Sequence, residues 1–229
     1  NVVINPISLW IARHGEATNT ADRRYGGIAD FPLSLIGLQQ AENLAKEAKQ
    51  IGIRHVLTSP LRRARQTAGI VASLLQDATL HVIEDLQEWN SYGVLSGLRA
   101  AEAHALFSDL MRAANGLPEH PSVSILGSEP PEIFLHRVEK AFHSCIQIAA
   151  NTPPRTCLVI GHGKFLDVLA LSVLHASGKM AYEPAHLYRL DYTPQAIELQ
   201  KHPRKESTKD QSRREIMKIY LVRHGEAED

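Results

Sequence analysis

The chain has 229 residues, which is enough for one large domain with a well-buried core. Its 25 Lys and Arg balance its 25 Asp and Glu, and this balance excludes a global charge that would attract nucleic acid or an anionic membrane surface. No run reaches the ~20 apolar residues of a transmembrane helix, and the N-terminus lacks the pattern of a signal peptide. Cys145 and Cys157 lie at predicted core positions, so we expect a cytoplasmic protein without a disulfide framework.

The chain opens with a strand, a loop and a helix. The apolar run Ile7–Ala12 predicts a strand that is buried on both faces. A loop rich in small and charged residues follows over 16–34. Ser34 is suited to cap the helix after this loop, and Gly52 is suited to end that helix.

The alternation of strands and helices continues to the end of the domain. Residues 89–130 are less regular and contain one predicted helix from about Arg99 to Ala114. The other predicted strands are His55–Thr58, Leu80–Glu84, Thr156–Ile160, Leu187–Tyr192 and Ala196–Gln200, the last two forming a hairpin around Thr193-Pro194. The other predicted helices begin at Ser59-Pro60, Pro130-Pro131 and Phe165. This order predicts an α/β fold of three layers, αβα, with a mainly parallel central sheet and an antiparallel edge hairpin.

The remainder of the chain differs in composition. Residues 204–215 are dense in charge and have no apolar period, which is typical of a solvated linker. We therefore divide the chain into a domain over 1–202, a charged linker over 203–215 and a separate segment over 216–229.

Chemically useful side chains follow the predicted strands. Arg13-His14, Ser59 with Arg62-Arg63, Glu88 and Gly161-His162-Gly163 each stand where a strand gives way to a helix or loop. Because parallel strands end at one edge of a sheet, these groups are expected to meet there. Guanidiniums bind phosphate oxygens, a neutral imidazole can attack phosphorus, and a carboxyl group can protonate the leaving oxygen. The set predicts phosphoryl transfer.

The same residues carry a resemblance to a known family. The quoted motifs are Arg13-His14-Gly15-Glu16, Pro32-Leu33-Ser34-x-x-Gly37-x-x-Gln40-Ala41, Ser59-Pro60-Leu61-x-Arg63-Ala64-x-Gln66-Thr67-Ala68, Leu86-x-Glu88 and Gly161-His162-Gly163. In this order they resemble the histidine phosphatase superfamily, also called phosphoglycerate mutase-like proteins, over roughly residues 7 to 200. The resemblance implies a hydrolase without a metal or organic cofactor.

The resemblance also implies roles for individual residues. His14 matches the nucleophile that becomes phosphohistidine, and Glu88 matches the general acid and base. Arg13, Arg63 and His162 match groups that hold the transferred phosphoryl group. Arg24, Gly27 and Gly163 fall at positions expected to touch substrate.

Two positions depart from the family pattern. Many relatives have an asparagine six residues after the nucleophile, where this chain has Thr20, with Asn19 one step earlier. The following glycine, Gly93, stands five positions after Glu88, whereas the family commonly has four, so either the loop bulges or the acid is displaced. Glu84 and Asp85 are the nearest alternatives to Glu88. Trp89 is expected either to pack in the core or to line the pocket.

The first motif occurs a second time. Met217 to Ala227, with Arg223-His224-Gly225-Glu226, resembles the opening of the small bacterial phosphohistidine phosphatases. No second arginine motif, acid or histidine motif follows it in the sequence. We expect it to be the start of a second, incomplete copy in a tandem protein. Alternatively, the segment pairs as an extra strand with a sheet of this molecule or of a neighbour.

The sequence therefore predicts a phosphoric monoester hydrolase. The expected reaction is metal-independent hydrolysis of a small phosphorylated metabolite through a phosphohistidine intermediate. The alternatives are a phosphoglycerate mutase, a phosphohistidine-protein phosphatase and a phosphate-binding module without catalysis. A mutase needs a basic lid to grip a carboxylate, whereas residues 89–130 offer only Arg99 and Arg112.

Overall fold

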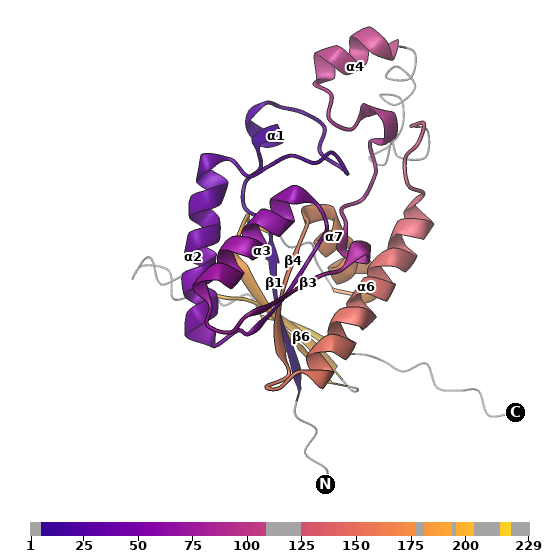
Figure 1. Cartoon of the computed structure of the whole chain (residues 1–229). Helices are drawn as coiled ribbons and strands as arrows, with labels where there is room; N and C mark the ends of the chain where they lie inside the picture. Colours follow the sequence, from indigo (N-terminus) through magenta and orange to yellow (C-terminus); the bar gives the residue numbers. More distant parts are fainter. Residues whose placement is uncertain (1–5, 109–124, 177–180, 194–195, 204–215, 221–229) are drawn as a thin grey trace, which may run out of the picture.

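The computed structural model describes residues 6–108, 125–176, 181–193, 196–203 and 216–220, which form a central sheet between two layers of helices (Figure 1). The strands are β1 (Ile7–Arg13), β2 (His55–Thr58), β3 (Thr79–Val82), β4 (Thr156–Gly161), β5 (Leu187–Tyr192), β6 (Ala196–Lys201) and β7 (Ile216–Tyr220). Their order across the sheet is β3-β2-β4-β1-β5-β6-β7. Strands β1 to β4 pair in parallel, and β5 and β6 form the antiparallel hairpin at the side. The predicted fold class is confirmed.

Helices cover both faces of the sheet. The helices are α1 (Thr18–Ala21), α2 (Leu35–Ile51), α3 (Arg62–Leu74), α4 (Ala100–Leu106), α6 (Pro131–Asn151) and α7 (Gly163–Val168), with shorter turns η1 (Glu84–Leu86), η2 (Gly93–Leu95) and the π-helical η4 (Leu169–Val173). Figure 1 shows α2 and α3 on one face of the sheet and α6 and α7 on the other. Each face buries its own apolar cluster, because strand side chains alternate between the faces. None of the described helices is long and apolar enough to cross a membrane.

The cap residues of α2 were predicted correctly. The Ser34 hydroxyl accepts a hydrogen bond from the Gly37 amide and begins the helix, and Gly52, in the left-handed conformation at φ 82°, ends it. Trp10, Cys145 and Cys157 are buried, as expected for core residues, and both cysteines are free thiols.

Several predicted boundaries were wrong. Helix α3 begins at Arg62 rather than at Ser59-Pro60, because the backbone of Leu61 is still extended, with ψ 138°. Strand β3 ends at Val82 because Glu84–Leu86 folds into a short 3-10 turn. The helix expected from Phe165 begins at Gly163 and changes to π-helical geometry at Leu169. The helix expected over 99–114 ends at Leu106, and residues 109–114 of that prediction lie outside the described residues.

The C-terminal segment adds a strand to the sheet. β7 pairs antiparallel with β6, with Gln200 opposite Ile216 and Ala196 opposite Tyr220. This pairing matches the alternative that the segment joins a sheet of its own molecule. Three predicted features lie outside the described residues. They are residues 204–215 of the linker, Pro194 in the hairpin turn, and the second motif at Arg223-His224. The division into three segments stays a prediction.

Candidate active site

Three strands deliver the site to one edge of the sheet. Arg13, the last residue of β1, lies opposite Gly161, the last residue of β4, and Thr58 at the end of β2 lies opposite Ile160. Backbone hydrogen bonds continue this register beyond the strands: the His14 amide donates to the Gly161 carbonyl at 3.0 Å, and the Ser59 amide donates to Ile160 at 3.2 Å. The parallel sheet thus places the residues after each strand side by side.

His14 is buried and held in one tautomer. Its Nδ1 lies 2.6 Å from the Gly15 carbonyl oxygen, which can only accept a hydrogen bond, so Nδ1 carries the proton. Nε2 therefore presents its lone pair, and the Arg63 Nε–H donates to it at 3.1 Å. Burial, followed by the charge of Arg63, lowers the pKa of His14 well below its ordinary value. The imidazole is therefore neutral, as a nucleophile must be.

The two predicted arginines converge on this imidazole from different elements. Arg63, in the first turn of α3, also donates through its Nη atoms to the carbonyl oxygens of Gly27 and Ala29, each at 2.8 Å. Arg13 lies against the start of α7, where a Cβ added to Gly163 would stand 3.7 Å from the Arg13 guanidinium carbon. A Cβ at that distance would make only an ordinary van der Waals contact. Arg13 Nη1 donates to the Tyr182 carbonyl at 3.5 Å, and the loop carbonyls hold Arg63 beside His14.

His162 completes the group from the end of β4. Its ring centroid lies 5.1 Å from that of His14, and its Nε2 lies 2.7 Å from the Ser59 hydroxyl oxygen. Burial, followed by the nearby His14, lowers the pKa of His162 well below its ordinary value. Ser59 also accepts a hydrogen bond from the Leu61 amide at 3.2 Å, so its hydroxyl hydrogen is free to point at His162 Nε2. In that arrangement the proton of the neutral ring is on Nδ1.

Two buried nitrogen atoms of this group have no hydrogen-bond partner among the described residues. They are Arg13 Nε and His162 Nδ1. Buried donors are rarely left unpaired in folded proteins, because the loss of hydration costs ~1–3 kcal/mol for each group. Two such donors beside a cationic Arg63 fit an anion with several oxygen atoms. The group therefore presents the kind of hydrogen-bond donors that an anion such as phosphate accepts.

The Glu88 carboxylate lies at the start of α7, the helix that directly follows His162 in the sequence. Its Oε1 accepts hydrogen bonds from the Trp89 amide at 2.9 Å and the Phe165 amide at 3.0 Å, and its Oε2 accepts one from Lys164 at 3.2 Å. Burial raises the pKa of Glu88, although these amides and Arg63 oppose the shift. The group is therefore more easily protonated than an ordinary glutamate, as a general acid should be.

The loop after His14 is fixed by close backbone contact with α2. A Cβ on Gly15 would stand 2.6 Å from the Gly37 carbonyl oxygen, and a Cβ on Gly37 would overlap the Glu16 carbonyl. Only glycine at both positions allows this approach. The Gly15 amide donates to the Thr67 hydroxyl at 3.1 Å, and the Glu16 amide donates to the Gln40 side chain at 2.8 Å.

Some residues singled out from the sequence lie elsewhere. The Arg24 guanidinium turns toward α4, where it donates to the Gly97 carbonyl at 2.9 Å and to Glu102 at 3.0 Å, so the structure does not bring it to His14. Asn19 donates to the Arg24 carbonyl. Asp85, an alternative acid, pairs with Lys140 at 2.9 Å.

Glu84 lies in the 3-10 turn η1, whereas the Glu88 carboxylate accepts from backbone amides of α7. Trp89 is a core residue rather than a pocket wall: its ring stacks on Phe134, with the two planes 4° apart. In this longer loop the Asn90 side chain donates to the Gly127 carbonyl at 2.8 Å, and the Glu88 carboxylate lies at α7.

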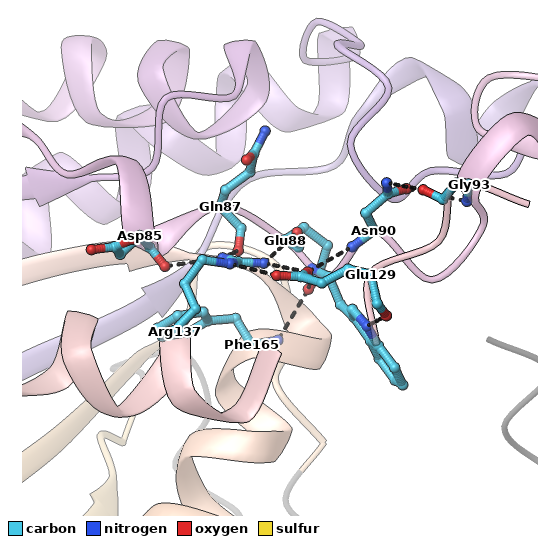
Figure 2. A network of polar contacts seen from close by, with 10 residues as sticks. Asp85, Gln87, Glu88, Asn90, Gly93, Glu129, Arg137 and Phe165 are labelled. Carbon is cyan, nitrogen blue, oxygen red and sulfur yellow. Dashed lines mark hydrogen bonds and ion pairs between the residues drawn. The ribbon is translucent and has the colours of Figure 1, made fainter. Parts of the chain in front are cut away.

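Sequence reasoning missed several supporting residues. Ser59 was expected at this edge, but its hydrogen bond to His162 was not predicted. Arg137 and Glu129 were not considered, although they form a bidentate ion pair beside the Glu88 loop (Figure 2). A signal was present, because Arg137 stands on the apolar stripe of α6 between Phe134 and Val138. Within the described ranges, no group of three or more His, Cys, Asp or Glu side chains could hold a metal ion.

Comparison with known proteins identifies the family of the chain. The model of the histidine phosphatase superfamily (branch 1) matches residues 9–204. The probable phosphoglycerate mutase GpmB of Yersinia pestis is 30% identical over 196 residues, which cover 81% of this chain and 85% of that protein.

Solved structures of two different activities share the fold. The α-ribazole phosphatase of Shigella flexneri has a TM-score of 0.67 at 24% identity and covers 82% of this chain and 91% of its own. The phosphoglycerate mutase of Bacillus anthracis has a TM-score of 0.69 at 23% identity, and the match covers 82% of this chain and 89% of that protein. Since phosphatases and mutases both match, the comparisons establish the family and not the reaction. The chain belongs to the histidine phosphatase superfamily, branch 1.

Proposed function

We propose that this chain is a metal-independent phosphomonoesterase that transfers the phosphoryl group of a small metabolite to His14 and then to water. The observation that carries this proposal is the pair of buried, unpartnered donors, Arg13 Nε and His162 Nδ1, next to a neutral imidazole with its Nε2 lone pair directed at Arg63. A phosphate that binds there satisfies both donors and brings phosphorus to Nε2.

In the first step, the phosphate oxygens take hydrogen bonds from Arg13, Arg63 and His162. Arg63 moves its Nε–H from His14 to the phosphate, which frees the Nε2 lone pair for attack on phosphorus. The bond from phosphorus to the ester oxygen breaks, and the protonated Glu88 carboxyl gives its proton to that oxygen. The products are the free alcohol and phospho-His14, with Glu88 left as a carboxylate.

In the second step, water attacks the phosphorus of phospho-His14. The Glu88 carboxylate takes a proton from this water, the bond from phosphorus to Nε2 breaks, and inorganic phosphate leaves. His14 returns to the neutral form with its proton on Nδ1, because the Gly15 carbonyl holds that proton throughout. Two displacements through one covalent intermediate replace a single difficult one.

A phosphoglycerate mutase is the second candidate, because a probable mutase is among the relatives at 30% identity. A mutase must also bind the substrate carboxylate. In the insertion after Glu88, Arg99 is the N-cap of α4, and Arg112 lies outside the described residues. We favour the phosphatase because this insertion has so few cationic groups. Isomerisation of 3-phosphoglycerate with little release of phosphate would reverse this choice.

The decisive experiment compares His14→Ala with the wild type on p-nitrophenyl phosphate and on a panel of phosphorylated metabolites. We expect release of phosphate by the wild type and a loss of about a thousandfold or more in the variant, because a nucleophile cannot be replaced. His143→Ala, on the exposed side of α6, is the control and keeps its activity. Equal inactivity of wild type and His14→Ala, with both still binding phosphate, would favour a binding module instead.

A further inference from the structure

The loop that carries Glu88 is held by a single side chain from another element. Arg137, on α6, has five N–H donors, and each has an acceptor. Nη1 donates to the carbonyl oxygens of Asp85 at 3.0 Å and Gln87 at 2.6 Å, and Nη2 donates to the Glu88 carbonyl at 3.3 Å. Figure 2 shows the guanidinium reaching from the helix to this stretch of backbone.

The two remaining donors of Arg137 bind the Glu129 carboxylate. Nε lies 2.8 Å from Oε1 and Nη2 lies 2.7 Å from Oε2, so the pair is bidentate. The side chains of Arg137 and Glu129 are 17% and 15% exposed, which makes the pair much less open to solvent screening than a surface ion pair. Glu129 fixes the plane of the guanidinium and so directs the other three donors.

Glu129 also contacts the loop on its other side. Its amide donates to the Asn90 carbonyl at 2.8 Å, and its carbonyl accepts from the Trp89 indole at 2.9 Å. Residues 85 to 90 are therefore bound at one end by Arg137 of α6 and at the other end by Glu129, in the segment that leads into α6. This binding is needed because the residues between η1 and η2 have no regular hydrogen-bond ladder of their own.

We propose that Arg137 is a positioning residue for the general acid: by binding the backbone of residues 85 to 88, it sets the distance between the Glu88 carboxyl group and the leaving-group oxygen. This inference rests on the proposed function of the site. The Glu88 carboxylate is otherwise fixed by the amides of Lys164 and Phe165 on α7, so its position depends on how the loop lies against that helix. Since α6 packs against η1 and α7, Arg137 fixes the loop relative to the helix whose amides bind the Glu88 carboxylate.

The inference predicts a dependence on the leaving group. A nitrophenolate leaves readily without a proton, whereas an alkoxide must be protonated as it leaves. Loss of the acid therefore costs activity on an alkyl phosphate and much less on p-nitrophenyl phosphate. Glu88→Gln is expected to lose about a hundredfold or more on an alkyl phosphate, the lower end of what a general acid contributes.

The experiment measures kcat/KM of the wild type, Glu88→Gln, Arg137→Gln and Arg137→Lys on glycerol phosphate and on p-nitrophenyl phosphate. We expect Arg137→Gln to lose about tenfold to a hundredfold on glycerol phosphate, because a displacement near 1 Å has effects of that size. On p-nitrophenyl phosphate the loss stays within a few-fold. Arg137→Lys keeps the charge but cannot span three carbonyls and a carboxylate, so it shows a smaller loss with the same substrate dependence.

Lys140→Gln is the matched control. Lys140 lies one turn further along α6 and binds the Asp85 side chain rather than the loop carbonyls, so both rates are expected to stay at the wild-type level. Equal loss on the two substrates in both Arg137 variants, or no loss in either, overturns the positioning role. Failure of the proposed function looks different, because the wild type would then release no phosphate or His14→Ala would remain active.

Discussion

The contact between Gly15 and Gly37 predicts that a single methyl group will disable the enzyme. In Gly15→Ala, the new Cβ would stand 2.6 Å from the Gly37 carbonyl oxygen, whereas ordinary contacts begin at 3.4 Å. The obstacle is backbone and not a flexible side chain, so the chain next to His14 must move by the difference, about 0.8 Å, to relieve it. Gly15 also supplies the carbonyl that fixes the His14 tautomer.

The size of the effect follows from that displacement. A shift near 1 Å at reacting atoms costs about a hundredfold in rate. Overpacking costs about 1–3 kcal/mol of the free energy of unfolding. In a domain of this size, each kcal/mol lowers Tm by about 2–4 °C. We therefore expect kcat/KM on p-nitrophenyl phosphate to fall by about a hundredfold while the protein still folds.

Two further glycine variants make the test specific. Gly37→Ala approaches the same contact from the opposite side, against the Glu16 carbonyl, and should produce a similar loss. Gly69→Ala, inside α3, meets no atom within 4 Å and should keep full activity and gain up to about 1 kcal/mol in stability. Wild-type activity in Gly15→Ala, or an equal loss in Gly69→Ala, would refute the steric reasoning.

Three further predictions concern titration, tautomer and thiols. The proposed reaction needs a neutral His14, and the pKa of His14 is lowered, so kcat/KM should rise with pH in the range below pH 6.5, the ordinary pKa of histidine. It also needs a protonated Glu88, and the pKa of Glu88 is raised, so kcat/KM on glycerol phosphate should fall only above pH 4.5, the ordinary pKa of glutamate. A rising limb at or above 6.5 would contradict the first shift. Ser59→Ala should lower kcat/KM about tenfold, because it leaves the buried His162 Nε2 without its hydrogen-bond partner at a cost of ~1–3 kcal/mol. The control Ser73→Ala, on an exposed part of α3, should keep the wild-type kcat/KM. Burial raises the pKa of Cys145 to about 12, so native protein should resist thiol labelling that is rapid after denaturation; fast native labelling would contradict this.

The convergence of the site could be predicted because it follows from parallel pairing alone. Once the apolar runs before Arg13 and His162 are recognised as strands of one parallel sheet, the residues after them must share an edge. The cap residues Ser34 and Gly52 were equally predictable, because their conformational preferences act locally.

Contacts that depend on loop placement could not be predicted in this way. Arg24 follows the first motif closely, yet its partner Glu102 lies 78 positions along the chain, on a helix whose position periodicity cannot give. The five-residue spacing after Glu88 left the position of the acid open. The contacts that hold this loop come from Arg137 of α6 and from Glu129 in the segment before it, which the local sequence around Glu88 does not reveal. The turn that shortens β3 and the π-helical end of α7 likewise depend on packing and not on pattern.

The hydrogen bond from Arg63 to His14 has a consequence for selectivity. In the free protein the attacking lone pair is already occupied by a guanidinium N–H at 3.1 Å. Only a molecule that offers Arg63 a better acceptor than an imidazole nitrogen can expose the nucleophile, and an anionic oxygen is such an acceptor. Carboxylic esters and other uncharged electrophiles lack that oxygen. The proposed mechanism therefore predicts that the resting protein does not react with them, because only an anionic substrate would free the Nε2 lone pair of His14.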